Sequence, residues 1–190
     1  MLLNRELRSP VPNLVTINVN DHRGSQIAIQ YLLKKGCRKI AYIAGPTHSI
    51  SNKRRLKGYR AALDSAGIPF NPQMVESGMP DTEGGRSAAA ALLARQPRVE
   101  AIYAFNDLMA IGAMQVCQES GRDIPRDVRI IGVDDIPPAT IIRPQLTTLH
   151  LDLAHIGSLA MRTLIDIIQG NKPSEQAIKV NSELVIRDSA

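Results

Sequence analysis

Two apolar segments that stop abruptly at polar pairs constrain the fold of this chain most strongly. Ala101–Gly112 is apolar up to Asn106–Asp107, where a helical pattern begins, and Arg129–Pro137 is apolar up to Asp134–Asp135, where a proline turn follows. A buried parallel strand has such a continuous apolar pattern. Ligands of open α/β sheets bind beyond the carboxyl ends of the strands. The two polar pairs are therefore the first candidates for a binding cleft.

The remaining sequence alternates between strand-like and helix-like segments, which predicts an α/β fold with a mostly parallel sheet and helices on both faces. The expected strands are Leu14–Val19, Lys39–Ala44, Gln73–Ser77, Val99–Phe105, Val128–Val133, Ser182–Arg187, and Leu146–Leu151 as a strand or a crossing segment. The expected helices are Ser25–Lys35, Asn52–Ala66, Glu83–Arg95, Leu108–Ser120 and Leu153–Gln169.

The composition narrows the classes of function. Only 3% of the 190 residues are aromatic, which argues against a stacking platform for single-stranded nucleic acid. The net charge of +5 is spread along the chain, so a solvated basic surface is favoured over a DNA-contacting face. Cys37 and Cys117 form no CxxC motif, and neither a signal peptide nor a membrane-spanning run is present. We therefore expect a soluble cytoplasmic chain.

Signals for catalysis and for cofactors are missing. The sequence has no GxGxxG, no GxxxxGK[ST] and no GxSxG motif, and its four histidines lack metal-type spacing. We therefore expect neither an enzyme nor a cofactor nor a metal. The candidate residues all suit binding.

The sequence allows two interpretations of the role of several polar residues. Lys53–Arg55 is either a solvated helix start or a place where an arginine fork reaches the cleft. Of Asn106–Asp107, one residue is expected to cap a helix while the other points across the cleft. Asp134 is either a turn residue or a ligand contact. Asp21 and Arg23 repeat the strand-end pattern more weakly.

The helix from Leu108 has more apolar surface than one core face requires. Leu108, Ile111 and Met114 form a second stripe beside the expected core stripe. Such a helix is either sandwiched or part of a subunit interface. The segment Ile136–Ile142 would complete a self-complementary patch.

Motifs along nearly the whole chain resemble the effector-binding domain of LacI/GalR-type bacterial transcription regulators. They are Arg38-Lys-Ile-Ala-Tyr-Ile-Ala-Gly-Pro46, Arg55-Leu-Lys-Gly-Tyr-Arg-Ala-Ala-Leu63, Ala66-Gly-Ile68, Phe105-Asn-Asp-Leu-Met-Ala-Ile-Gly112, Ile124-Pro-Arg-Asp-Val128, Gly132-Val-Asp-Asp-Ile136 and Pro144-Gln-Leu-Thr-Thr148. Any one of these motifs is weak evidence. Their occurrence together, in the order and spacing of the family, indicates the resemblance strongly.

The resemblance implies a periplasmic-binding-protein-like I fold, with two doubly wound parallel-sheet subdomains around a cleft. It places residues 1–36 and 151–176 in the N-terminal subdomain, and residues 37–150 and 177–190 in the C-terminal subdomain. Three crossings would join them, near Gly36–Cys37, near His150 and before the last strand. Because no helix-turn-helix precedes Met1 and the chain starts near a late strand, Leu2–Arg5, we expect a truncated chain with an incomplete N-terminal subdomain.

The resemblance also implies roles for particular residues. Arg55, Asn106 and Asp134 would contact the effector, with Lys53, Asp21 and Arg23 as further candidates. The family usually carries an aromatic cleft residue after the strand Gln73–Ser77, where this chain instead has Met79, the candidate for packing against an apolar edge. The implied dimer interface comprises Leu108, Ile111, Met114, Ile136, Ile141 and Ile142.

The expected function is therefore the effector-binding and dimerisation domain of a LacI-type repressor. It would sense a small polar ligand such as a sugar or a sugar derivative, and it would reach DNA only through a separate N-terminal domain. One alternative is a periplasmic sugar-binding protein of a transport system. Another is a doubly wound enzyme that uses Asp134 with His150 or His155.

Overall fold

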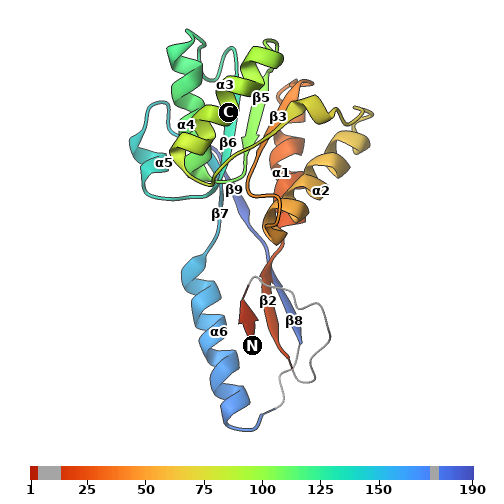
Figure 1. The fold of residues 1–190 in the computed structure, drawn as a ribbon. Coiled ribbons are helices and arrows are strands. Elements are labelled where there is room, and N and C mark those ends of the chain that lie inside the picture. Colours follow the sequence, from red (N-terminus) through yellow and green to blue (C-terminus); the bar gives the residue numbers. More distant parts are fainter. Residues whose placement is uncertain (4–13, 172–175) are drawn as a thin grey trace.

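The computed structural model describes residues 1–3, 14–171 and 176–190, and contains two sheets that lie at opposite ends of the molecule (Figure 1). The larger sheet has six strands in the order β4-β3-β5-β6-β7-β9, and the smaller has three in the order β1-β2-β8. All neighbouring strands are parallel except β7 and β9. This confirms the predicted α/β fold with mostly parallel sheets.

The larger sheet carries helices on both faces, as expected for strands that are apolar on both sides. Its strands are β3 (Ile40–Ala44), β4 (Val75–Ser77), β5 (Ala101–Ala104), β6 (Arg129–Asp134), β7 (Thr147–His150) and β9 (Glu183–Val185). The helices around it are α1 (Asp21–Lys34), α2 (Ile50–Ser65), α3 (Thr82–Arg95), α4 (Asp107–Glu119) and the short α5 (Pro138–Ile141). A 3-10 turn at Pro72–Met74 precedes β4.

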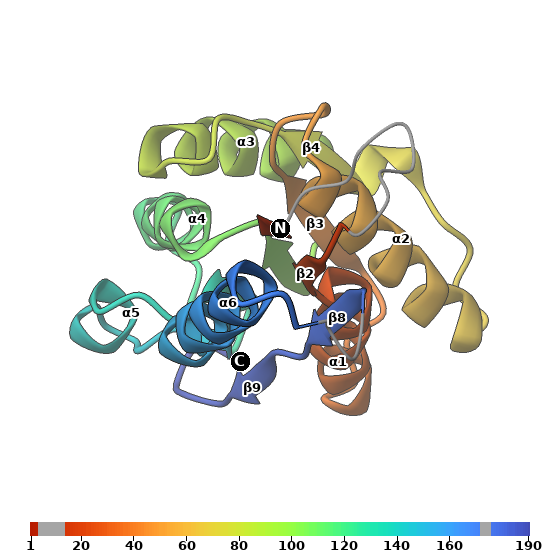
Figure 2. The same cartoon turned by 90° about the horizontal axis from the view of Figure 1, so that it is seen from below.

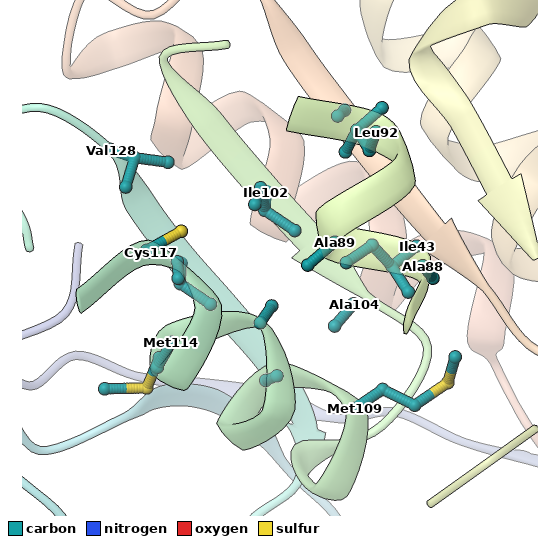
Figure 3. Packing of buried hydrophobic residues seen from close by; sticks show 14 of the residues in the cluster. Ile43, Ala88, Ala89, Leu92, Ile102, Ala104, Met109, Met114, Cys117 and Val128 are labelled. Atoms are coloured by element: carbon teal, nitrogen blue, oxygen red, sulfur yellow. The ribbon is translucent and has the colours of Figure 1, made fainter. Parts of the chain in front are cut away.

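On one face of this sheet, small residues allow α3 and α4 to pack closely against each other and the strands (Figure 3). Ala88 and Ala89 of α3 face Ile102 and Met109 within one buried cluster. A methyl group at Gly112 would approach the carbonyl oxygen of Thr82 to 2.1 Å, so this helix contact requires glycine. The Ala-rich sequence of α3 therefore sets a short distance between the two helices.

On the opposite face, which α1 and α2 cover, three buried tyrosines from β3, β5 and α2 form a stack. The ring centroids of Tyr42 and Tyr59 are 5.8 Å apart, and those of Tyr42 and Tyr103 are 5.3 Å apart. Each hydroxyl has a partner: Tyr59 donates to the Ile40 carbonyl, Tyr42 donates to Asn52, and Tyr103 pairs with the Ser25 hydroxyl. Burial of these rings is thus compatible with hydrogen bonding of their polar atoms.

The smaller sheet is much less covered. It consists of β1 (Leu2–Leu3), β2 (Thr16–Val19) and β8 (Ala177–Val180), with helix α6 (Leu153–Ile168) lying beside it (Figures 1 and 2). In α6 only Ala160 is buried. Its exposed large apolar residues are Leu153, Met161, Leu164, Ile165 and Ile168. Among the described residues, no helix combines the length and apolarity needed to span a bilayer.

Three connections join the two parts, at Asn20, at Leu151–Asp152 and at Asn181–Ser182. Asn20 donates to Asn181 over 2.9 Å, which ties the first connection to the third. The second connection directly follows His150, and the third precedes β9.

The expected boundaries at residues 36 and 176 need correction. Helix α1 belongs to the larger part because its apolar side, including Ala28, Ile29 and Leu32, is buried in the tyrosine cluster. The first crossing is therefore at Asn20 and not at Gly36–Cys37. Strand β8, which was assigned to the C-terminal subdomain, pairs with β2 of the smaller sheet. Residues 4–13 and 172–175 of these expectations lie outside the described residues.

Candidate functional site

A cavity of about 280 Å³ lies where the two parts of the molecule meet. It is lined from the smaller part by Ile17, Asn18, Val19 and Val180, from the connection and α6 by Leu151, Leu153 and Ile156, and from the larger part by Arg55 and Asp134. Asp134 is the last residue of β6 in the larger sheet, and Val180 is the last residue of β8 in the smaller sheet. This is where open α/β sheets bind ligands.

Arg55 lies in the second turn of α2, whose start is fixed by the Ser49 hydroxyl, the acceptor for the backbone N–H of Asn52 at 3.3 Å. The side chain of Arg55 is buried. Its Nε donates to Asp21 Oδ1 at 2.8 Å, its Nη1 donates to the Phe105 carbonyl, and its guanidinium carbon lies 4.7 Å from the centre of the Phe105 ring. These contacts fix a planar donor fork at the cavity.

Neighbouring acidic groups favour the charged form of Arg55. Burial alone would lower its pKa, but the carboxylate of Asp21, together with Tyr103 and Asp134, raises it above the ordinary value. The same burial raises the pKa of Asp134, while Arg55 acts to lower it. At the cavity, Arg55 therefore offers hydrogen-bond donors and Asp134 offers an acceptor.

Two buried oxygen atoms beside this pair have no hydrogen-bond partner among the described residues. They are Oδ1 of Asn18, a cavity residue, and Oδ2 of Asp21. An unsatisfied buried acceptor costs about 1–3 kcal/mol. Because Asn18 lines the cavity, its oxygen would gain a partner from a ligand that supplies O–H or N–H donors.

Of the predicted binding residues, Arg55 and Asp134 line the cavity, and Asp21 is paired with Arg55 without lining it. Lys53 and Arg23 are exposed and do not line the cavity. Sequence reasoning missed Asn18 and the apolar residues of β8 and α6. Asn18 stands inside a predicted strand, where a single polar residue gives no signal, and β8 was not predicted as a strand.

Asn106 and Asp107 both have structural roles. Asn106 caps α4 by accepting from the N–H of Met109 at 2.9 Å, and its Nδ2 donates to the Pro80 carbonyl at 3.0 Å. Asp107 does not point across the cleft, because its carboxylate is fully buried against Thr148 and the backbone N–H of Ile136. Burial raises the pKa of Asp107 to about 7, although both of these hydrogen bonds act to lower it.

Met79 lies away from Arg55. It is 65% exposed and lines a second, more open cavity of about 400 Å³ between β4 and α3. The other residues of that cavity include Glu76, Asp81 and Glu83. Glu76 is paired with Arg95 at 2.8 Å, and Asp81 caps α3. Two carboxylates of that second cavity are therefore already engaged, one in an ion pair and one in a helix cap.

The predicted dimer residues differ in exposure. Leu108 and Ile141 are exposed, while Ile111, Ile136 and Ile142 are half-buried. Met114 is 2% exposed and belongs to the core, so its assignment to the outer stripe was wrong.

Comparison with known proteins identifies the family of the chain. The family described as "periplasmic binding protein-like domain" matches residues 29–190. The chain is 33% identical to HTH-type transcriptional regulator CelR of Thermobifida fusca, covering 97% of this chain and 54% of the relative. It is 35% identical to the ribose operon repressor of Escherichia coli K12, covering 92% and 53%.

Solved structures give the same result. A CelR–cellobiose complex superposes with a TM-score of 0.93 at 32% identity, covering 100% of this chain and 58% of the other. A sugar-binding LacI-family regulator of Escherichia coli in complex with phosphate gives 0.91 at 30% identity, covering 100% and 67%. The chain spans about half the length of the curated relatives named above.

The relatives named above are transcription regulators and not enzymes, and they do not favour the transport-protein alternative. The family match and the mostly parallel sheets both agree with these relatives. The chain therefore belongs to the periplasmic-binding-protein-like domain family, in the form of the effector-binding part of LacI-family transcription regulators.

Proposed function

We propose that this chain binds a neutral sugar in the cavity at Arg55 and thereby controls the operator binding of a LacI-type regulator. The observation that carries the proposal is the cavity itself, which joins a fixed arginine fork and an aspartate of the larger part to residues of the smaller part. DNA contact by a helix-turn-helix region, location in the cytoplasm and dimerisation belong to the same proposal.

The polar groups at the cavity favour a polyhydroxyl ligand. Arg55 supplies donors, whereas Asp134 and Asn18 supply acceptors, and Asn18 Oδ1 is buried without a partner among the described residues. Sugar hydroxyls both donate and accept, so they match such a mixed set. Ile17, Val19 and Leu151 offer apolar surface for the C–H faces of a ring.

The charge balance favours a neutral ligand over an anionic one. The cationic Arg55 is already paired with Asp21, and Asp134 adds a second carboxyl group. A phosphate or sugar acid would meet no uncompensated positive charge there. This narrows the expected ligand class from sugars and sugar derivatives in general to uncharged sugars, the class that includes the cellobiose of the CelR complex.

Ligand binding at this place would act on the arrangement of the two parts. Because both parts contribute to the cavity walls, a ligand gains contacts as they close, and it therefore favours the closed state. A DNA-binding region attached to this chain would respond to that change, so that ligand binding and DNA binding are linked by a coupling free energy.

Dimerisation would use a separate surface. We assign the contact between the two subunits to Leu108, Ile111, Ile136, Ile141 and Ile142.

Calorimetry with cellobiose and ribose tests the proposal. We expect binding to the wild-type protein and a loss of about 30-fold or more in affinity for Arg55→Ala, since truncating a buried charged partner costs about 2–5 kcal/mol. Arg55→Lys, which keeps a cation near Asp21 but not the fork, guards against misfolding. Arg86→Ala, which breaks a surface pair with Glu119, is the control. Unchanged affinity in both Arg55 variants would refute the site.

A further inference from the structure

Two consecutive aspartates at the end of β6 have backbone conformations that residues with side chains rarely adopt. Asp134 has φ of 113° and Asp135 has φ of 57°. Aspartate tolerates the second value, but the first lies outside the left-handed helical region. Such a conformation persists only where the surroundings hold it in place. Since Asp134 lines the cavity, whatever holds it also determines the site.

The side chain of Asp135 provides the first tether. Arg187 Nη2 donates to Asp135 Oδ1 at 2.6 Å, and His150 Nδ1 lies 2.9 Å from Asp135 Oδ2. Arg187 is itself fixed, because its Nη1 donates to the Leu146 carbonyl at 2.8 Å and its backbone N–H donates to Thr147 Oγ1 at 2.9 Å. Asp135 is thus held from β7 and from the chain that follows β9.

The carboxylate of Asp107 provides the second tether, on the other side of the strained pair. The backbone N–H of Ile136 donates to Asp107 Oδ2 at 2.9 Å, and Thr148 Oγ1 donates to Asp107 Oδ1 at 2.5 Å. A methyl group at Gly132 of β6 would lie 2.2 Å from Asp107 Oδ1, so this position has no room for a side chain. Asp107 therefore joins α4, β7 and the turn after β6.

None of the residues that form these tethers lines the cavity. We infer that Asp135, Arg187 and Asp107 are positioning residues, which hold Asp134 in its strained conformation at the cavity without contacting the ligand. The expected effect on ligand affinity rests on the proposed function. The expected effect on the backbone of Asp134 does not depend on any ligand.

The same tether also reaches the opposite wall of the cavity. His150 is the residue of β7 that lies beside Asp134 in the sheet, and it is followed directly by Leu151, which lines the cavity. Through its two oxygens Asp135 therefore fixes both the aspartate of β6 and the start of the connection to α6. Loss of its carboxylate is expected to loosen both walls.

Asp135→Gly gives the sharpest test, because glycine accepts φ of 57° without strain while it removes the carboxylate. We expect the affinity for cellobiose to fall about tenfold or more, since a charged hydrogen-bond network is lost. Asp135→Asn, which tolerates the same backbone conformation and keeps one acceptor, should bind closer to wild type. Melting curves of each variant establish that it is folded at the temperature of the titration.

A second pair of variants tests the tether from the other side. His150→Asn places an amide near the position of Nδ1 and should retain most of the affinity, whereas His150→Leu should lose affinity in the same direction as Asp135→Gly. Arg187→Ala should do so too. Arg86→Ala, which removes two hydrogen bonds to Glu119 on the surface, is the matched control and should bind as wild type.

The ligand-free part of the experiment uses the backbone chemical shifts and the HN–Hα coupling of Asp134, which report its φ. We expect them to move to ordinary extended values in Asp135→Gly and to stay unchanged in Arg86→Ala. An unchanged Asp134 backbone in Asp135→Gly overturns the inference, as does wild-type affinity in that variant. If the wild-type protein binds neither cellobiose nor ribose, the proposed ligand class fails, and the backbone measurement still decides the inference.

Discussion

The two parts of the molecule bury their apolar residues to very different degrees. Every residue of β3 and β5 in the larger part is buried, and two buried clusters cover the two faces of that sheet. In the smaller part β8 alternates between exposed and half-buried residues, and α6 has a single buried residue. Burial of apolar surface contributes about 25 cal/mol per Å². The larger part therefore supplies most of the stability, while the smaller part supplies one wall of the cavity.

The largest expected effect contrasts two isoleucines of the same size. Ile102→Ala, in the buried strand β5, should destabilise the protein by about 2–5 kcal/mol, since it leaves a cavity in the core. Ile168→Ala, at a position that is 75% exposed in α6, should change stability by less than about 0.5 kcal/mol. Urea unfolding of both variants measures the contrast. Equal costs would show that α6 is packed against something in solution.

This contrast explains which elements were predictable. Strands β3, β5 and β6 of the larger sheet contain continuous apolar runs and were predicted within a few residues. Strands β4, β7 and β9 include polar residues; their segments were also named, that of β7 as a strand or a crossing segment. Strand β8 was missed because Ala177–Val180 includes a lysine and leaves two positions exposed, which resembles a loop. Helix α1 was predicted but assigned to the wrong part, since an apolar face alone does not identify the sheet that it covers.

A second prediction concerns Asp107, a buried acid of the larger part. Its pKa is raised from 3.8 to about 7 in the folded state, so the unfolded chain ionises first as the pH rises. The contribution of this group to stability is therefore complete below about pH 4 and is lost between about pH 4 and 7. Since each pKa unit corresponds to about 1.4 kcal/mol, the loss is on the order of 4 kcal/mol.

Asp107→Asn removes this titration. We expect the stability of the wild-type protein relative to Asp107→Asn, measured by urea unfolding, to be lower at pH 8 than at pH 5. Other titrating groups cancel in this difference, which isolates the buried carboxyl. The same difference at both pH values would contradict the buried ionisation.

The candidate site was predictable only in part. Strand ends, which are readable from sequence, pointed to Asp134 and Asp21, and the family resemblance added Arg55. The exclusion of Asn106 and Met79 from the cavity depends on the local caps and on the separation of two cavities, which no sequence pattern shows. The positive φ of Asp134 had no sequence signal either, because aspartate is usual at a strand end.

The smallest expected effects contrast two helical glycines. In α2, a methyl group at Gly58 would lie 2.3 Å from the backbone oxygen of His22, so Gly58→Ala should cost about 1–3 kcal/mol. In α6, a methyl group at Gly157 meets nothing within 4 Å. Gly157→Ala should therefore raise stability by up to about 1 kcal/mol through helix propensity. Thermal unfolding measures both changes, and a loss at Gly157 would indicate a close neighbour of α6.

The central claim is that the cavity shared by the two parts, and not the cavity at Met79, receives the ligand. A crystal structure of the protein with cellobiose tests it most directly. We expect sugar hydroxyls within hydrogen-bond distance of Arg55 and Asp134, and of the unsatisfied Asn18 oxygen. Sugar bound between β4 and α3, with the Arg55 cavity occupied only by water, would contradict the account.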